Sequence, residues 1–388
     1  MKIIGSLSSL VITSAVASFA PIPSMAQSAI EPTPFTLAKG LEGPRGLRFG
    51  PDGNLYVAEA GTGGTNSTIG QCPQVPGPPG GPGPDTGGLT ARISKINPSS
   101  LKVTTVASGF PSVSIGPGGV NGTIGVADVV FLDGDLYALI GGGGCSHGNP
   151  NMKDASGIAK VDIKTGNWHL IADIGAWLKT HPAKFESADD FEPDGTLYSV
   201  IAQDGKLLTV EPNHGQVISV TKGGEIKQVI DISASEGHIV PTSIVARDGS
   251  LFVGNLNLFP INPQWARILT ISKSDQDDFD NSPPGLEPAR GHRIVSSKAG
   301  FTTVVAVDFG PDGLLYVLEL SDGAGLPTPG LGKVVRVKRS GAIEDVVINL
   351  SVPTGMTFGP DGRLYVSNLG AAPAGAGQIL RFDISPGW

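Results

Sequence analysis

Residues Phe49–Gly64 read FGPDGNLYVAEAGTGG, and the first half of this stretch returns twice near the other end of the chain. It appears there as FGPDGLLYVLEL from Phe309 and as FGPDGRLYVSNL from Phe358. A shorter form, Asp-Gly-x-Leu followed by an aromatic residue, occurs six times, beginning at Asp52, Asp133, Asp194, Asp248, Asp312 and Asp361. Self-similarity at intervals of roughly 50 to 80 residues indicates a repeat architecture.

Each copy of the phrase lies inside a larger pattern of short strands. An apolar segment precedes most copies, and a segment of alternating apolar and polar residues follows them, such as RISKI from Arg92 or VVRVK from Val334. Such alternation is typical of a half-buried strand. A fourth strand follows in most copies, for example KVTTVA from Lys102. Six units of four antiparallel strands predict an all-β fold, a six-bladed β-propeller, in which each sheet packs against two neighbours.

The Asp-Gly of the phrase is expected to form a turn rather than a catalytic site. Pro51 fixes φ at about −65° in the first turn position, Asp52 tolerates the second, and Gly53 accepts a positive φ. The phrase therefore predicts a tight hairpin between the innermost and second strands of each blade.

Composition and charge narrow the class of partner. The 388 residues include 56 glycines and 32 prolines, which favours a fold with many turns. Lys and Arg number 27 against 35 Asp and Glu, so the net charge is −8, and no long basic run is present. We therefore expect a small molecule or a protein as the partner, and no nucleic acid.

The N-terminus has the three parts of a secretory signal peptide. Lys2 supplies the positive charge, Leu10–Phe19 is largely apolar, and Ser24-Met25-Ala26 offers a small-x-small cleavage site. Cleavage after Ala26 predicts a mature protein that begins at Gln27 and is secreted or periplasmic. No later apolar stretch reaches the roughly 20 residues that span a bilayer, so we expect no membrane span. We also expect the protein to be a monomer.

The predicted domain organisation follows from the signal and the repeat. Residues 1–26 are the signal peptide, and residues 27–388 form a single propeller domain. The blades are expected at residues 44–109, 120–175, 185–233, 239–299, 301–350 and 352–384. The last unit ends after its third strand, so we expect Pro34–Leu41 (PFTLAKGL), from the start of the mature chain, to supply the fourth strand and close the ring.

Three insertions rich in Gly and Pro interrupt the repeat on the face where the blade-to-blade connections lie. They are Gly61–Thr90, Gly141–Gly157 and Ser108–Gly125. Cys72 lies in the first of them and Cys145 in the second, on adjacent blades, which predicts a disulfide in an oxidising compartment. Free thiols are the alternative. A metal site on this pair is a weaker hypothesis, because only His147 lies nearby and zinc usually takes four ligands.

A second candidate site comes from the position seven residues after each phrase aspartate. Side chains with oxygen atoms occupy it in four copies: Glu59, Asn255, Glu319 and Asn368. Ile140 and Ile201 occupy it in the other two. Carboxylates and amides that converge near the central channel could ligate Ca²⁺, the one cofactor that the sequence indicates. The alternative is that these side chains cap the following turn through hydrogen bonds to the backbone.

Histidines in loops of the same face are the remaining candidates. His238 with the neighbouring Glu236 is the best candidate for a general base, and His147 is a third candidate binding residue. The acidic stretch Ser274–Ser282 (SDQDDFDNS) resembles a calcium loop in charge, but it lacks the glycine and the final carboxylate of such a loop. We expect it to be a solvated loop on the opposite face. GxSxG, P-loop and dinucleotide-binding motifs are absent from the sequence.

The first unit resembles a known family. The stretch Gly43–Gly64 (GPRGLRFGPDGNLYVAEAGTGG), then Cys72, the Pro/Gly loop and Thr90–Ile96 (TARISKI), are similar to the ScyD/ScyE family of secreted NHL-like propeller proteins, named from the cyanobacterial gene cluster for the pigment scytonemin. The resemblance extends over roughly Phe35–Asp383. It implies an extracytoplasmic propeller that supports pigment or envelope metabolism, with no established reaction.

Two classes of function follow. The favoured one is a non-enzymatic propeller that binds a small molecule or a protein through its loop-rich face. The alternative is a metal-dependent, Ca-type hydrolase resembling gluconolactonase, with its site over the central channel formed by Glu59, Asn255, Glu319 and Asn368. A quinone-dependent sugar dehydrogenase would need a positively lined channel with a defined base, which the sequence does not identify.

Overall fold

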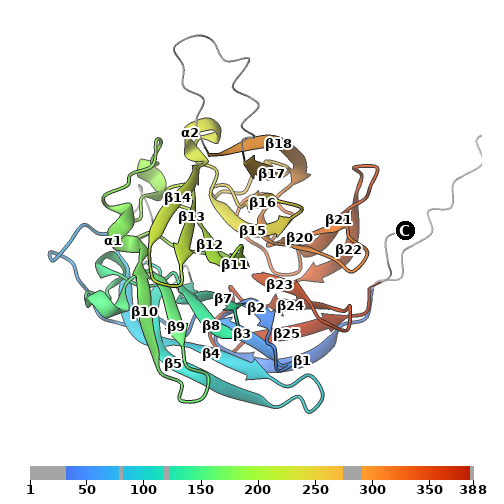
Figure 1. Cartoon of the computed structure of the whole chain (residues 1–388), viewed down its shortest axis with the longest axis horizontal. Helices are drawn as coiled ribbons and strands as arrows, with labels where there is room; N and C mark the ends of the chain where they lie inside the picture. The colour runs from blue at the N-terminus through green and yellow to red at the C-terminus, as the bar shows by residue number, and fades with distance from the viewer. Residues whose placement is uncertain (1–31, 78–81, 117–121, 274–290, 385–388) are drawn as a thin grey trace, which may run out of the picture. The chain divides into compact units, whose positions relative to one another are not determined.

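The computed structural model describes residues 32–77, 82–116, 122–273 and 291–384. In this part of the chain six antiparallel sheets are arranged as blades in a ring (Figure 1). The predicted six-bladed β-propeller is therefore confirmed. No helix within these ranges is long and apolar enough to cross a membrane. The predicted signal peptide and the acidic stretch Ser274–Ser282 lie outside the described residues.

The first three blades follow one another along the chain. Blade 1 consists of β2 (Pro44–Phe49), β3 (Leu55–Glu59), β4 (Thr86–Ile96), β5 (Val103–Ser114) and the short β6 (Thr123–Ile124). Blade 2 consists of β7 (Val126–Leu132), β8 (Asp135–Ile140), β9 (Gly157–Val161) and β10 (Trp168–Asp173). Blade 3 consists of β11 (Ser199–Gln203), β12 (Lys206–Glu211), β13 (Gln216–Thr221) and β14 (Ile226–Asp231).

The other three blades repeat this order. Blade 4 consists of β15 (Pro241–Arg247), β16 (Ser250–Asn255), β17 (Ala266–Lys273) and β18 (His292–Phe301). Blade 5 consists of β19 (Val304–Phe309), β20 (Leu315–Glu319), β21 (Gly332–Val337) and β22 (Ile343–Leu350). Blade 6 consists of β23 (Gly355–Phe358), β24 (Leu364–Asn368), β25 (Gly377–Phe382) and β1 (Phe35–Leu41). Short helices, among them α1 (Ile174–Leu178) and α2 (Ser233–Glu236), lie in the connections.

The outermost strand of blade 6 comes from the other end of the chain. Strand β1 pairs antiparallel with β25, with Thr36 opposite Leu380 and Leu41 opposite Gly377. The blue β1 and the red β25 lie side by side in Figure 1. Leu41 is buried in a cluster of apolar side chains from blades 1 and 6. Closure of the ring by the N-terminal strand is confirmed.

The repeated phrase joins neighbouring blades as well as turning the chain. The aromatic residue after each turn packs edge-to-face against a phenylalanine of the next blade in four pairs: Tyr56–Phe131, Phe252–Phe309, Tyr316–Phe358 and Tyr365–Phe49. Where the phrase reads FGPDG, the tyrosine hydroxyl also donates to the turn aspartate of its own blade: Tyr56 to Asp52, Tyr316 to Asp312 and Tyr365 to Asp361. Each aromatic pair contributes about 0.5–1.5 kcal/mol beyond the burial of its area.

Two kinds of turn serve these hairpins. After Pro51 and Asp52, Gly53 has the positive φ of 73°, as the turn chemistry predicts. In blade 2 no proline precedes the pair, and both Asp133 (φ 53°) and Gly134 (φ 84°) are left-handed. Two positive φ angles are characteristic of the two-residue hairpin turn whose twist matches that of the strands.

Blade 3 differs from the predicted alignment. Its hairpin lies at Asp204-Gly205, where both residues have a positive φ (50° and 71°), and the predicted hairpin at Asp194-Gly195 is wrong. Asp194-Gly195 belongs to the connection from blade 2, in which Ala188–Asp190 forms a single 3-10 turn. Both sites carry the same turn residues, but only Asp204-Gly205 lies between two apolar segments that pair with each other, β11 and β12.

Candidate functional site

One face of the ring carries both the connections between second and third strands and those between blades. The last residue of the second strand lies opposite the first residue of the innermost strand: Glu59 opposite Pro44, Asn255 opposite Pro241, and Glu319 opposite Val304. The connection that enters a blade and the connection that follows its second strand therefore lie at the same edge of that blade. We call this side of the ring the loop-bearing face.

The four predicted calcium ligands lie at this edge, and each is engaged with the backbone. The N–H groups of Glu42, Thr302 and Ser351 donate to Glu59, Glu319 and Asn368, respectively, over 2.7, 3.0 and 2.8 Å. Asn255 accepts from the N–H of Arg267 at 2.8 Å and donates to the carbonyl of Ile239 at 2.9 Å. The donors to Glu59, Glu319 and Asn368 each lie 17 residues earlier, so these bonds hold the connection that enters the blade and do not cap the turn after the strand.

The geometry gives the calcium hypothesis no ready-made cluster. Across the described ranges, no group of three or more His, Cys, Asp or Glu side chains is placed to hold a metal ion. The carboxylates of Glu59 and Glu319 come from separate blades and are each committed to a connection of their own blade. Calcium binding by these residues stays a prediction.

A fifth residue belongs to the same set and was missed by the sequence alignment. Glu211 ends β12, seven residues after Asp204, and is fully buried. It accepts from the N–H of Thr196 at 3.0 Å and from the N–H of His214 at 2.6 Å. Burial raises the pKa of Glu211, but the contacts with His214 and Thr196 outweigh this and lower it. Aligning QDGKLLTVE, instead of EPDGTLYSV, with the repeat would have identified it.

Glu59 and Glu319 occupy equivalent positions but are neutralised unequally. Glu59 pairs across the strands with Arg92, whose Nε and Nη2 donate to the two carboxylate oxygens at 3.0 and 2.9 Å. Glu319 lies opposite Lys333, whose Nζ is 3.7 Å from Oε2 and only 2.7 Å from Asp322. Oε2 of Glu319 is buried without a hydrogen-bond partner in the described part of the chain. Burial raises the pKa of Glu319 to about 7, against the opposing effect of Lys333.

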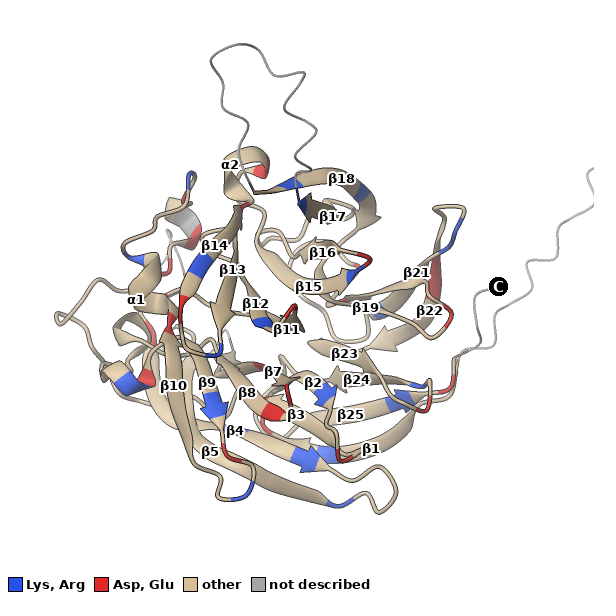
Figure 2. Cartoon of the chain, in the orientation of Figure 1, with Lys and Arg blue, Asp and Glu red and all other residues tan. Residues whose placement is uncertain are grey.

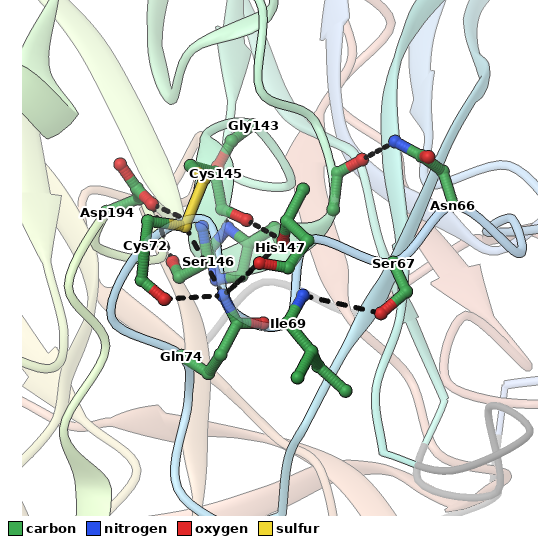
Figure 3. The surroundings of a disulfide bond; sticks show 12 residues. Asn66, Ser67, Ile69, Cys72, Gln74, Gly143, Cys145, Ser146, His147 and Asp194 are labelled. Carbon is green, nitrogen blue, oxygen red and sulfur yellow. Dashed lines mark hydrogen bonds between the residues drawn. A yellow bond between two sulfur atoms is a disulfide. The ribbon is translucent and has the colours of Figure 1, made fainter.

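The predicted disulfide is present and joins blades 1 and 2 on the loop-bearing face. Cys72 and Cys145 are bonded, with their Cα atoms 6.3 Å apart (Figure 3). The Thr68 hydroxyl donates to the carbonyl of Cys145, and Gln74 Nε2 donates to the carbonyl of Cys72 at 2.9 Å. The two insertions are thus held together by hydrogen bonds as well as by the covalent bond.

His147 lies directly after this disulfide and is fully buried. Its Nδ1 is 2.6 Å from the carbonyl of Gly143, and its Nε2 is 2.9 Å from the carboxylate of Glu192 (Figure 3 shows the ring beside Gly143). Both neighbours accept hydrogen bonds, so both ring nitrogens carry protons and the ring is an imidazolium. Burial lowers the pKa of His147, but Glu192, Asp85 and Asp194 outweigh it and raise the pKa to about 9. The geometry gives His147 a structural ion pair.

Asp194 ties the same loop to the connection between blades 2 and 3. The N–H and hydroxyl of Ser146 donate to its Oδ2 at 2.7 and 2.6 Å (Figure 3), and Lys179 Nζ is 2.6 Å from Oδ1. Burial raises the pKa of Asp194, but Lys179 and Ser146 outweigh it and lower the pKa. The blade 2 loop and the connection to blade 3 are therefore joined through Asp194 and through the ion pair of His147 with Glu192.

His238 and Glu236, considered together from the sequence, have separate partners. His238 Nε2 is 2.8 Å from Oδ2 of Asp190, whereas Glu236 forms an ion pair with Arg267 at 2.9 Å. Nδ1 of His238 is buried and has no hydrogen-bond partner among the residues described. A general-base role for His238 therefore stays a prediction, with Asp190 rather than Glu236 orienting the ring.

The loops that join the second and third strands of blades 4 and 5 expose large apolar side chains, unlike the loops around the disulfide, which bury charged groups. Residues 256–265 and 320–331 meet through a bridge in which Ile261 and Gly325 exchange two backbone hydrogen bonds. Together they expose five large apolar side chains, which we call the blade 4–5 patch: Leu258, Phe259, Trp265, Leu326 and Leu331. Trp265 is 64% exposed and Leu326 is 71% exposed. An apolar group of this kind on a soluble protein commonly marks a binding surface.

The space between the innermost strands, along the central axis of the ring, is small. The innermost strands line a cavity of about 20 Å³, which is enough room for about one water molecule. Arg48 and Asp128 are among its lining residues. Burial raises the pKa of Asp128, against the opposing effect of Arg48. The axial cavity itself therefore has no room for a ligand larger than about one water molecule.

Comparisons with known proteins agree with the propeller fold. No family model matches the sequence, and no curated protein matches it either. Similar solved structures include the calcium-binding protein regucalcin from Agrobacterium tumefaciens, with 13% identity, coverage of 91% of this chain and 94% of that chain, and a TM-score of 0.53. A gluconolactonase from Xanthomonas campestris has 11% identity, coverage of 91% and 89%, and a TM-score of 0.51. The PQQ-bound aldose sugar dehydrogenase of Streptomyces coelicolor has 11% identity, coverage of 90% and 97%, and a TM-score of 0.52. At these identities the likeness shows the fold alone.

Proposed function

We propose that this chain is a secreted or periplasmic binding protein that holds a small molecule or a protein on its loop-bearing face. The observation that carries the proposal is the blade 4–5 patch, where two bridged loops expose Trp265 and Leu326 to solvent. Two aromatic side chains and three leucines are exposed on two adjoining loops, and apolar groups exposed together commonly mark a site of interaction with a partner.

The opposite side of the same face supports a binding role through its rigidity. The Cys72–Cys145 disulfide and the ion pair of His147 with Glu192 hold the loops of blades 1 and 2 in one arrangement. Pre-organised loops lose little conformational entropy when a partner binds. The disulfide also suits a compartment outside the cytoplasm.

A thermal-shift screen of a metabolite and glycan library tests the proposal. The mature chain is compared with a Trp265→Ala/Leu326→Ala double variant and with Met152→Ala, a matched variant of an exposed apolar residue in the blade 2 loop. We expect a ligand that raises the melting temperature of the wild type and of Met152→Ala but not of the double variant. Ligands that stabilise all three proteins equally would place binding elsewhere.

A Ca-dependent hydrolase of the gluconolactonase type is the second candidate, favoured by one observation. Glu319 keeps a buried carboxylate oxygen without a hydrogen-bond partner in the described residues, at the position predicted for a metal ligand. Metal analysis of the purified protein, with melting in EDTA, tests this candidate. Bound calcium that is lost together with stability, and that is absent from Glu319→Ala, supports it; metal-free protein whose melting is unchanged refutes it.

The resemblance of blade 1 to the ScyD/ScyE family is the basis for proposing the cellular process in which the binding protein acts. We propose that the ligand belongs to pigment or envelope metabolism outside the cytoplasm. Growth of a deletion strain under ultraviolet light, with pigment and envelope composition measured, tests this link. Unchanged composition in the deletion strain argues against it.

A further inference from the structure

The blade 4 loop has a composition that limits what the blade 4–5 patch can bind. Residues 256–265 read LNLFPINPQW, and residues 323–331 of the facing loop read GAGLPTPGL. Neither stretch contains a charged side chain, whereas the first combines two aromatic rings with three side-chain amides: Asn257, Asn262 and Gln264. The bridge between Ile261 and Gly325 joins the two loops backbone to backbone.

Two of the three amides, those of Asn262 and Gln264, are available to a ligand. Asn262 and Gln264 are exposed beside Trp265, and neither side chain has a hydrogen bond to the described protein. Asn257 differs from these two, because its Oδ1 accepts from the buried Asn255 at 2.8 Å and its Nδ2 is itself buried. A ligand that covers this surface must therefore supply hydrogen bonds to amide groups next to aromatic faces.

Charges at the rim of the patch are neutralised within the chain. Arg267, at the base of the blade 4 loop, pairs with Glu236 at 2.9 Å. Lys333, at the base of the blade 5 loop, pairs with Asp322 at 2.7 Å. Lys and Arg are interspersed with Asp and Glu around the ring (Figure 2), and the net charge is −8. Both of these cations, at the bases of the two described loops, are thus paired within the chain, and the overall charge disfavours an anionic ligand.

We propose that the blade 4–5 patch binds an uncharged carbohydrate chain; this inference rests on the proposed binding function and names its ligand class. A sugar ring presents an apolar C–H face, which stacks on an aromatic ring such as Trp265 or Phe259. Its hydroxyl groups donate to and accept from side-chain amides such as Gln264. An apolar protein surface would cover the rings equally well but would leave the amides buried and unsatisfied.

Native affinity electrophoresis of the mature protein tests this inference. The gels contain dextran, amylopectin or hydroxyethyl cellulose as neutral polysaccharides, and alginate or dextran sulfate as anionic ones. We expect retardation in at least one neutral gel and none in the anionic gels. Trp265→Ala and Phe259→Ala are each expected to weaken this retardation about tenfold, because each removes one stacking surface. Met152→Ala should be retarded like the wild type, and circular dichroism of every variant controls for folding.

The possible outcomes separate this inference from the general binding function. Retardation in the anionic gels alone, equal retardation of wild type and Trp265→Ala, or no retardation in any neutral gel would each overturn carbohydrate binding. A non-carbohydrate ligand from the thermal-shift screen, lost in the Trp265→Ala/Leu326→Ala variant, would then leave the binding function standing with another ligand class. Failure of both experiments would overturn both proposals.

Discussion

The ring of Tyr365, in the last blade, packs edge-to-face against that of Phe49, in the first, with centroids 5.0 Å apart and planes at 75°. The two residues come from the last and first copies of the same repeated phrase. Their contact is equivalent to the one that joins Tyr56 to Phe131 within the chain. The joint that closes the ring is therefore built in the same way as a joint between consecutive blades.

Removing the closing aromatic ring should destabilise the propeller. Tyr365→Ala deletes a buried ring and is expected to lower the free energy of unfolding by about 3–5 kcal/mol. Tyr365→Phe keeps the ring and loses only the 2.9 Å hydrogen bond to Asp361, at a cost of about 1 kcal/mol. Urea unfolding measures both. Tyr137→Phe is the matched control, since no turn aspartate accepts from Tyr137 among the described contacts; a cost equal to that of Tyr365→Phe would contradict the role given to Asp361.

Glu319 should make the stability fall as the pH rises towards neutrality. Its folded-state pKa of about 7 lies above its ordinary value of 4.5, so the folded state binds the proton more tightly than the unfolded state. The stabilisation is complete below about pH 4.5 and is lost as the pH rises through 7. Glu319→Gln lacks this titration, so wild type should lose up to about 3 kcal/mol relative to the variant between pH 4.5 and pH 8. Urea unfolding across this range checks it; a constant difference between the two proteins would refute the assignment.

His147 should affect stability in a higher pH window. Its pKa of about 9 in the folded state exceeds its ordinary 6.5, so its stabilisation is complete below about pH 6.5 and is lost as the pH rises through 9. Glu192→Gln removes the carboxylate that contacts Nε2 and should lower this pKa. Nitrogen chemical shifts of the ring, followed by NMR, report it directly. A neutral ring at pH 7 in the wild type would contradict the double protonation inferred from its two acceptors.

Loss of the disulfide should destabilise the loops of blades 1 and 2 and leave the other blades folded. The bond closes a loop with a sequence separation of 73 residues, for which about 2–5 kcal/mol of stabilisation is expected. Cys72→Ser/Cys145→Ser should therefore melt earlier, with faster hydrogen exchange in residues 141–156 than in blade 5. Thiol titration of denatured, unreduced wild-type protein should find no free thiol. Two free thiols, or uniform exchange in the variant, would contradict this prediction.

Most of the fold was predictable because the turn chemistry and the strand pattern agree. Pro51, Asp52 and Gly53 specify a hairpin locally, and apolar segments on either side confirm it, so five of the six hairpins were placed correctly. Ring closure followed from the missing strand, which β1 supplies. The disulfide followed from topology, since both cysteines lie after the second strand of adjacent blades. Blade 3 failed because Asp194-Gly195 and Asp204-Gly205 are equivalent as turns, and only strand pairing distinguishes them.

The buried contacts of the site were less accessible to prediction. Asp190 reaches His238 only because a single 3-10 turn in a long connection places it there, 48 residues away in sequence. The ion pair of His147 with Glu192 depends on the same connection. Such irregular segments lack the periodicity from which strands are recognised, so their side-chain partners follow from tertiary packing. The blade 4–5 patch was missed because exposure of Trp265 depends on how two loops meet.

Strand β1 sets a condition on when this protein can fold. Thr36 is paired with Leu380, so the sheet of blade 6 has its first and last strands from opposite ends of the chain. A nascent chain that still lacks β25 cannot complete that sheet, because β25 lies between β1 and β24. Contacts of such long sequence separation make folding slow. Moving residues 34–41 behind the C-terminus would turn this long-range pairing into a local hairpin, and the change in folding rate would measure how much the long-range pairing slows folding.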